Sequence, residues 1–181
     1  MGALAFWKAV VSDRSNFLER MIAMLEDNGI RYCVIGGVGV NAYAEPIVTL
    51  DLDVVVAADQ LDRVRELAAA AFKTREFPYS FNVYDPDSKL QVQIQLRPEM
   101  APLVDRARVR DVMDLQLPVA APDDLLRAKI EAAIEPTRRP SKRGKDFIDI
   151  ARLLTTFPEL RPLVPAEIWP RVQEVLDSEE T

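Results

Sequence analysis

The ten residues from Ile47 to Val56 constrain the fold of this chain more than any other segment. They read IVTLDLDVVV, a β-branched and aliphatic run that carries Asp51 and Asp53, and such a composition predicts a buried strand. Side chains two apart on a strand project from the same face, so the two carboxylates should lie side by side. Carboxylates this close repel each other unless a cation lies between them. The segment therefore predicts a strand with a cation-binding face.

Magnesium is the natural cation for such a pair, because it takes oxygen ligands and keeps waters that a substrate phosphate can replace. An edge strand that carries two acids only for solubility is the alternative. A separate apolar run, Tyr32–Ile35, ends in Gly36 and Gly37, and glycines let backbone N–H groups approach an anion. A plain turn that needs positive φ is the alternative for the glycines. Together the two segments favour a phosphate cradle beside a metal pair on neighbouring strands.

Composition removes several classes of chemistry. The 181 residues include no histidine and one cysteine, Cys33, which excludes Ser-His-Asp and Cys-His catalysis, Cys/His zinc sites and an internal disulfide. Proton transfer and metal ligation must therefore use carboxylates, lysines, tyrosines, amides or water. The net charge of −6 argues against general coating of nucleic acid but not against a local basic patch. Without a secretion signal or a long apolar stretch, we expect a cytoplasmic protein with no membrane contact.

The remaining pattern predicts an α/β fold, a small mixed sheet with helices on one side, followed by a helical C-terminal part. Helices are expected over residues 15–27, 60–72, 122–132, 145–154 and 166–176, a hairpin over 79–84 and 90–96, and one further strand over 112–120. Residues 38–44 predict a short helix or an ordered loop, and residues 135–144, which lack apolar side chains, predict a mobile connection. We expect two units, residues 1–121 and 122–181, with the site in the groove between them.

Several of these motifs resemble the nucleotidyltransferase superfamily related to DNA polymerase β. The shared residues are Val34-Ile35-Gly36-Gly37, the spacing to Thr49, and Asp51-Leu52-Asp53-Val54. Two later segments, residues 125–129 and 143–150, resemble the small bacterial branch that is similar to AbiEii-type toxin nucleotidyltransferases. The resemblance covers residues 31–154. It implies a nucleotidyltransferase core and Mg²⁺-dependent transfer of a nucleoside monophosphate from a nucleoside triphosphate to an acceptor hydroxyl or phosphate.

The resemblance also implies roles for single residues. Asp51 and Asp53 are expected to hold Mg²⁺, while the residues expected to contact the nucleotide are Gly36, Gly37, Thr49, Gln93 and Lys145. Lys129 and Asp146 join the two aspartates as candidate catalytic residues. Asp146 and Asp149, three apart on one helix face, either orient the lysines or complete the metal shell, and Asp146 is alternatively a helix cap.

The acceptor and any partner protein are not determined by the residues. Within the superfamily the acceptor can be tRNA, a protein side chain, an antibiotic or another nucleotide, and a toxin-like member implies a possible cognate partner. The basic run over residues 138–145 is either a solvated loop or a mobile arm that closes on triphosphate or RNA.

Two departures from the superfamily pattern support a second interpretation. Gln93 stands where larger members carry a third acid, and Ile47 stands where relatives commonly carry arginine. A neutral amide holds a second metal poorly, and the loss of a guanidinium removes a phosphate contact. The alternative is therefore a catalytically weak nucleotide- or partner-binding module, for instance one half of a toxin–antitoxin pair. A third interpretation treats the acids and the basic run as ordinary surface.

Overall fold

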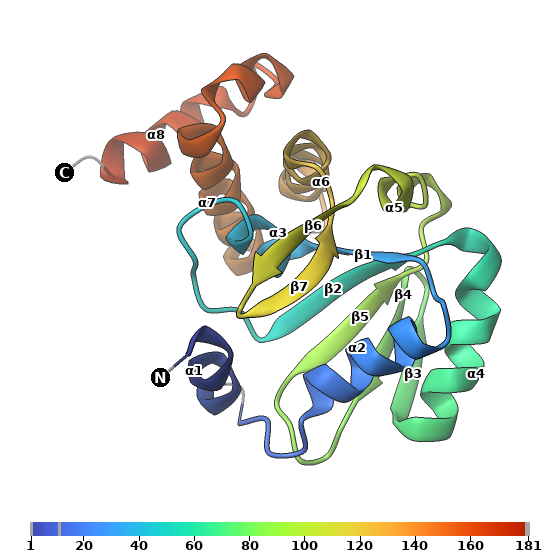
Figure 1. The fold of residues 1–181 in the computed structure, drawn as a ribbon. Helices are drawn as coiled ribbons and strands as arrows, with labels where there is room; N and C mark the ends of the chain where they lie inside the picture. The colour runs from blue at the N-terminus through green and yellow to red at the C-terminus, as the bar shows by residue number, and fades with distance from the viewer. Residues whose placement is uncertain (1, 11, 180–181) are drawn as a thin grey trace.

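Seven strands form one mixed sheet in the computed structural model, which describes residues 2–10 and 12–179 (Figure 1). Their order across the sheet is β3-β4-β5-β2-β1-β7-β6. The strands are β1 (Tyr32–Ile35), β2 (Asp51–Val56), β3 (Lys73–Phe77), β4 (Ser80–Tyr84), β5 (Gln91–Gln95), β6 (Arg108–Val112) and β7 (Leu115–Val119). The α/β class and the mixed sheet expected from the sequence are confirmed.

Strand β2 lies at the centre of the sheet and sets the position of the two aspartates. It runs antiparallel to β1 and parallel to β5, and Asp53 is in register with Gln93 of β5. On one face of β2, the alternate residues Leu52 and Val54 are fully buried. Because side chains alternate along a strand, Asp51 and Asp53 lie together on the opposite face. The pairing of β2 with β5 therefore places the two carboxylates beside the glutamines of β5.

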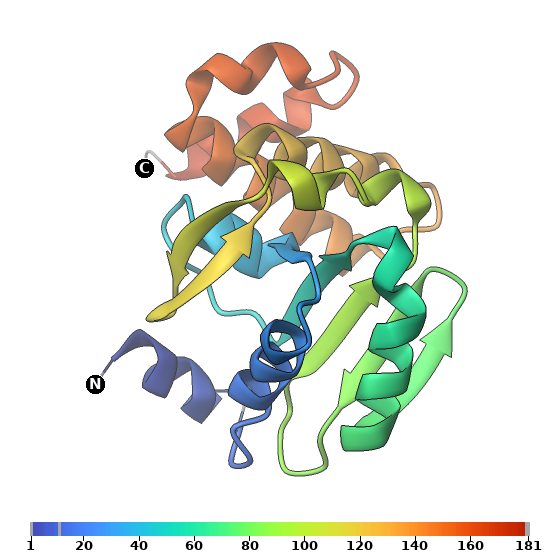
Figure 2. The same ribbon diagram turned by 45° about the vertical axis from the view of Figure 1, so that its right-hand side comes forward.

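Helices cover both faces of the sheet (Figures 1 and 2). The helices are α1 (Ala3–Val10), α2 (Phe17–Asp27), α3 (Gly36–Asn41), α4 (Leu61–Ala71), α5 (Leu103–Arg106), α6 (Pro122–Ile134), α7 (Pro140–Thr156) and α8 (Trp169–Glu179), with short 3₁₀ turns at Ala58–Gln60, Pro98–Met100 and Pro158–Leu163. Helices α2 and α4 lie on one face, and α3, α6 and α7 lie on the other. The expectation of helices on one side is wrong: all four residues of β1 are buried, as a strand covered on both faces requires.

The loop before β2 is longer than the sequence predicts. The β-prone run from Ile47 was expected to be strand throughout, but β2 begins at Asp51. The side chain of Asn41 donates to the carbonyl of Ile47 and accepts from its N–H, so the backbone groups that a neighbouring strand would use are already bonded. Val48 and Leu50 remain exposed in this loop.

Two further expectations are corrected in the second half of the chain. The single strand expected over residues 112–120 is the hairpin β6-β7, because Met113 and Asp114 both adopt positive φ and reverse the chain. The mobile connection expected over residues 135–144 ends at Pro140, where α7 begins. Proline is favoured in the first turn of a helix, where its missing N–H has no partner to lose. The polar stretch after Pro140 is thus the exposed start of a helix.

Strand β3 and helix α1 were not expected at all. The β3 sequence KTREF is polar at four of five positions and forms one edge of the sheet, where a strand needs little apolar surface.

Within the described ranges, no helix has the length and apolar character needed to cross a membrane. The division at residues 121 and 122 stays a prediction, since α6 follows β7 directly and packs on α3 and α7.

Candidate active site

A cavity of about 220 Å³ opens between the polar face of β2 and β5 and the helices α6 and α7. The cavity lies where the sequence predicted the groove. Its charged and amide lining residues are Asp51, Asp53, Gln93, Gln95, Arg97, Lys129, Glu131, Glu135, Arg138, Lys142 and Asp146, and Ile35 and Gly36 close it at the end of β1. We call it the central cavity.

Gly36 is required by its own backbone and by Asp53. It adopts φ +65°, a conformation that costs energy for any residue with a Cβ. A Cβ built there would lie 2.2 Å from Oδ2 of Asp53, well inside van der Waals contact. Gly37 differs, because a Cβ there would be 3.6 Å from Oγ1 of Thr49, an ordinary contact. The first glycine therefore lets the Asp53 carboxylate lie directly against the backbone.

The two glycines give a matched pair for a stability test. We expect Gly36→Ala to lower the free energy of unfolding by more than about 2 kcal/mol, since it adds backbone strain and a collision with Asp53. Gly37→Ala, within α3, should change it by less than about 1 kcal/mol, because alanine is the better helix former. Urea denaturation of both variants measures the difference. Equal effects would show that Gly36 does not hold the strained contact.

The pKa of Asp53 is raised above its ordinary value of 3.8, mainly because burial disfavours the charged form. Lys129 acts against this shift, and the neighbouring charge of Asp51 adds to it. Nε2 of Gln95 lies 3.4 Å from Oδ1 of Asp53 and donates a long hydrogen bond. The carboxylate is therefore held in a setting where a further positive charge would be stabilising.

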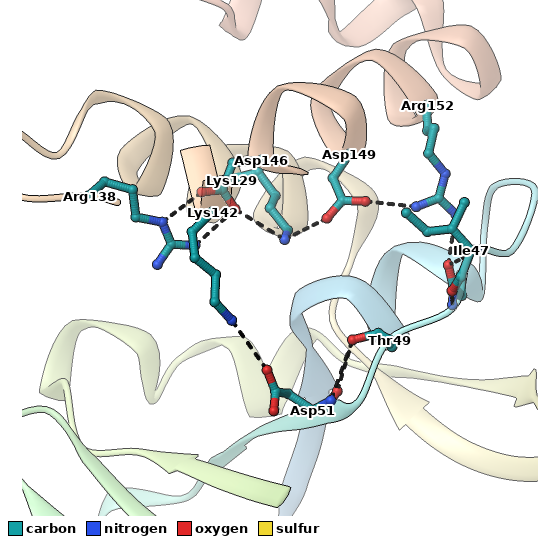
Figure 3. Close-up of polar contacts among 10 residues, drawn as sticks. Ile47, Thr49, Asp51, Lys129, Arg138, Lys142, Asp146, Asp149 and Arg152 are labelled. Carbon is teal, nitrogen blue, oxygen red and sulfur yellow. Dashed lines mark hydrogen bonds and ion pairs between the residues drawn. The ribbon is translucent and has the colours of Figure 1, made fainter. Parts of the chain in front are cut away.

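The side chain of Asp51 is 32% exposed and pairs with a lysine. Oδ2 of Asp51 lies 3.4 Å from Nζ of Lys142 on α7 (Figure 3), and half of the Lys142 side chain is exposed. Thr49 supports the start of β2, because its hydroxyl lies 3.4 Å from the carbonyl oxygen of Asp51. Trp7 in turn donates its indole N–H to the carbonyl of Thr49 at 2.9 Å. The strand end that carries Asp51 is thus fixed from two sides.

A chain of paired charges, most of them buried, lies on α6, α7 and the loop that joins them, at the wall of the cavity (Figure 3). Nζ of Lys129 is 2.6 Å from Asp149 and 3.4 Å from Asp146. Arg138 donates two hydrogen bonds to Asp146, at 2.8 and 3.0 Å, and Arg152 pairs with Asp149 at 2.7 Å. We call these five residues the buried ion-pair chain. Each of its carboxylates faces two cations, so the five residues together carry one positive charge.

The buried ion-pair chain continues to the loop before β2. Arg152 donates to the side chain of Asn41 at 2.7 Å and also to the carbonyl of Glu45. Asn41 is the residue that holds Ile47 out of the sheet. The same arginine therefore links α7 to the loop that precedes the two aspartates.

The donor set fits a magnesium ion. Asp51 and Asp53 lie on one face of β2 and line one cavity, and Mg²⁺ is commonly held by one or two carboxylates, waters and substrate phosphates. Within residues 2–10 and 12–179 there is no cluster of three or more Asp, Glu, Cys or His residues of the kind that cages a metal. An ion shared between the two aspartates and a polyphosphate is compatible with the site.

The structure brings together six of the nine candidate residues. The six that line the central cavity are Gly36, Asp51, Asp53, Gln93, Lys129 and Asp146. Gly37, Thr49 and Lys145 do not line it, and Lys145 is exposed on α7. Asp146 is turned toward Lys129 and Arg138, which favours the orienting role over the metal shell. The nucleotide contacts of Gly37, Thr49 and Lys145 stay predictions.

Sequence reasoning overlooked three cationic residues of the cavity, Arg97, Arg138 and Lys142. Lys142 and Arg138 were seen only as parts of a basic run, because the start of α7 was placed too late. With α7 beginning at Pro140, Lys142 lies one turn before Lys145 and faces Asp51. Arg97, directly after β5, lines the cavity as well, and no motif pointed to it.

Several solved structures share the fold of this chain. The fold matches solved structures of nucleotidyltransferases, among them the antibiotic-resistance factor ANT(2'')-Ia (TM-score 0.62, 11% identity, 90% of this chain and 95% of that chain). It also matches the lincosamide antibiotic adenylyltransferase LnuA bound to lincomycin (TM-score 0.52, 15% identity, 78% and 97%) and an antigenic nucleotidyltransferase-like protein from Paracoccidioides brasiliensis (TM-score 0.53, 17% identity, 94% and 92%). At these identities the likeness shows the nucleotidyltransferase fold. A search of curated proteins gave no match.

The family follows from the sequence itself. Residues 39–180 match the model of the nucleotidyl transferase AbiEii toxin of type IV toxin–antitoxin systems. The chain therefore belongs to the AbiEii family, and the resemblance noted from the motifs is confirmed.

Proposed function

We propose that this protein is a Mg²⁺-dependent nucleotidyltransferase. The observation that carries the proposal is the convergence of Asp51 and Asp53 with Lys129 and Lys142 in one cavity. Two carboxylates suit a divalent ion, and lysine ammonium groups suit the phosphates that the ion would share. Membership of a nucleotidyl transferase family supports the same conclusion.

The chain's own residues would act mainly by positioning and charge. Lys129, fixed by Asp146 and Asp149, presents its charge where a polyphosphate would lie, and Lys142 can exchange Asp51 for a phosphate oxygen because it is half exposed. When bound, Mg²⁺ would neutralise charge that develops on the transferring phosphoryl group. The acceptor oxygen bonds to the α-phosphorus and releases its proton to water. The bond from the α-phosphorus to the oxygen that bridges to the β-phosphorus breaks, and that oxygen leaves with pyrophosphate.

Labelled nucleotides test the proposal. Incubation with Mg²⁺, candidate acceptors and α-³²P nucleoside triphosphates should label an acceptor, while γ-³²P nucleotides should not, because the γ-phosphate leaves with pyrophosphate. Asp53→Ala should abolish labelling, and Asp59→Ala, an exposed acid outside the cavity, should not. Equal labelling by wild type and Asp53→Ala would refute the proposal.

Gln93 supports the second candidate, a nucleotide-binding module with weak or no turnover. It stands beside Asp53 in the parallel pairing of β2 and β5 and lines the cavity, so no carboxylate occupies that position. If Gln93→Asp transfers label and wild type only binds nucleotide, the module is favoured. If wild type is active and Gln93→Asp adds little, the enzyme is favoured.

The proposal includes a partner protein and a cellular location. The AbiEii description names a toxin of a toxin–antitoxin system, so we propose a cognate antitoxin and a cytoplasmic location for this chain. Expression of the chain alone should slow bacterial growth, and co-expression of its cognate regulator should restore it. If Asp53→Ala slows growth as much as the wild type does, the toxicity does not depend on nucleotidyl transfer.

A further inference from the structure

A second cavity lies beside the central cavity and shares two lining residues with it. It has a volume of about 470 Å³ and is lined by Pro78, Tyr79, Leu96, Arg97, Pro98, Glu99 and Glu135. Arg97 and Glu135 line both cavities. The two side chains are partly exposed and pair with each other at 3.9 Å, so a ligand with a polyphosphate in the central cavity would pass beside this ion pair to reach the second cavity. We call the second cavity the outer cavity.

The position of the outer cavity follows from strand pairing. Strand β4 runs antiparallel to β5 so that Ser80 lies opposite Gln95, and the N–H of Leu96 donates to the carbonyl of Tyr79 at 3.0 Å. The turn between β3 and β4 is thus tied to the end of β5. Gln95 lines the central cavity, so the turn that carries Tyr79 lies beside the central cavity.

Tyr79 offers an aromatic face with a cation over it. The residue is 65% exposed, although a tyrosine ring is a large apolar surface that is usually at least half buried. The guanidinium of Arg97 lies 5.2 Å from the ring centroid. An exposed ring beside an arginine is the arrangement by which proteins stack nucleobases.

The charges of the outer cavity indicate what kind of group it takes. Among the residues that the structure describes, Arg97 is the one cation that lines it, and Glu99 and Glu135 are the acids. With a single cation against two acids the outer cavity offers a phosphate little, whereas the central cavity carries Lys129, Arg138 and Lys142 for phosphates and two aspartates for a divalent ion. A neutral planar ring attached to a phosphate chain fits both cavities, with the phosphates in the central cavity and the ring in the outer cavity.

We propose that Tyr79 and Arg97 form a stacking subsite for a nucleobase whose phosphates lie in the central cavity. The proposal rests on the proposed function and extends it to the recognition of the ring. The base can come from the nucleoside triphosphate or from a ribonucleotide end that serves as acceptor, and the chemistry of stacking is the same for both.

Phe77 provides a matched control for Tyr79. It lies two residues away, and Arg75 lies over its ring at 4.9 Å. It lines neither the central nor the outer cavity. Phe77→Ala therefore removes an exposed aromatic ring that, like Tyr79, has an arginine over it, and leaves Arg75 and the proposed subsite unchanged.

Calorimetry on the full chain with Mg²⁺ tests the subsite. The probes are the four nucleoside triphosphates, inorganic tripolyphosphate, which has no base, and a short single-stranded RNA. Tyr79→Ala should weaken either the nucleotides or the RNA by about 5- to 100-fold, with tripolyphosphate unchanged. Tyr79→Trp should restore or improve the affinity, and Phe77→Ala should have no effect.

Each outcome has one meaning. Loss confined to the nucleotides assigns the subsite to the transferred nucleotide, and loss confined to RNA assigns it to the acceptor. If Tyr79→Ala binds every probe as tightly as the wild type does, the subsite is overturned and the proposed function stands. The same holds if Phe77→Ala weakens binding as much as Tyr79→Ala does. Absence of any nucleotide or tripolyphosphate binding by the wild type overturns both.

Discussion

Asp53→Asn should abolish nucleotidyl transfer and at the same time stabilise the metal-free protein. Burial raises the pKa of Asp53, and the charge of Asp51 raises it further. The ionised carboxylate therefore costs folding free energy at neutral pH, in spite of the attraction of Lys129. Asparagine has nearly the same shape and removes that cost, but it removes one carboxylate from the proposed metal site as well.

The sign of the pH effect follows from the direction of the shift. Between the ordinary pKa of 3.8 and the raised pKa of folded Asp53, the folded state binds more protons than the unfolded state. The free energy of unfolding of the wild type should therefore fall as pH rises through this window, relative to Asp53→Asn. Urea denaturation of both proteins with EDTA, from pH 4 upward, measures the difference. A variant that is less stable than wild type at neutral pH contradicts this account of Asp53.

Lys129→Met should destabilise the protein by about 3 kcal/mol and abolish transfer. The ammonium is largely buried between Asp146 and Asp149, whose side chains are 2% and 4% exposed. Loss of one partner from a buried ion pair typically costs about 3 to 5 kcal/mol. The lower value is expected here because Arg138 and Arg152 remain beside the two carboxylates.

Lys142→Met is the matched control, since it removes a second lysine of the same cavity. Its pair with Asp51 is half exposed, and exposed ion pairs contribute little to stability. We expect its free energy of unfolding to stay within about 0.5 kcal/mol of wild type, while the KM for nucleotide rises. Urea midpoints and steady-state kinetics separate the two lysines. Equal destabilisation by both variants would show that Lys129 has no special structural role.

The sequence predicted the centre of the fold well, because strong apolar patterns define it. The strand Tyr32–Ile35 is found as expected, and the alternation of Leu52 and Val54 with two aspartates placed the carboxylates on one face. Local composition was sufficient there, since burial on both sides of a strand selects such residues.

The errors fall where long-range contacts decide the structure. The loop at Ile47 is held by the side chain of Asn41, which in turn contacts Arg152 more than a hundred residues later. The polar start of α7 has no apolar periodicity, so Lys142 was not placed opposite Asp51. The edge strand β3 likewise carries little apolar signal.

We expect one divalent ion in the central cavity, held by Asp51, Asp53 and a polyphosphate. Anomalous diffraction from crystals grown with Mn²⁺ and a non-hydrolysable nucleoside triphosphate locates such an ion. We predict a manganese peak about 2 Å from an oxygen of each aspartate, with the phosphates beside Lys129 and Lys142. Phosphates bound elsewhere, or a manganese ion that contacts neither aspartate, would contradict the claim.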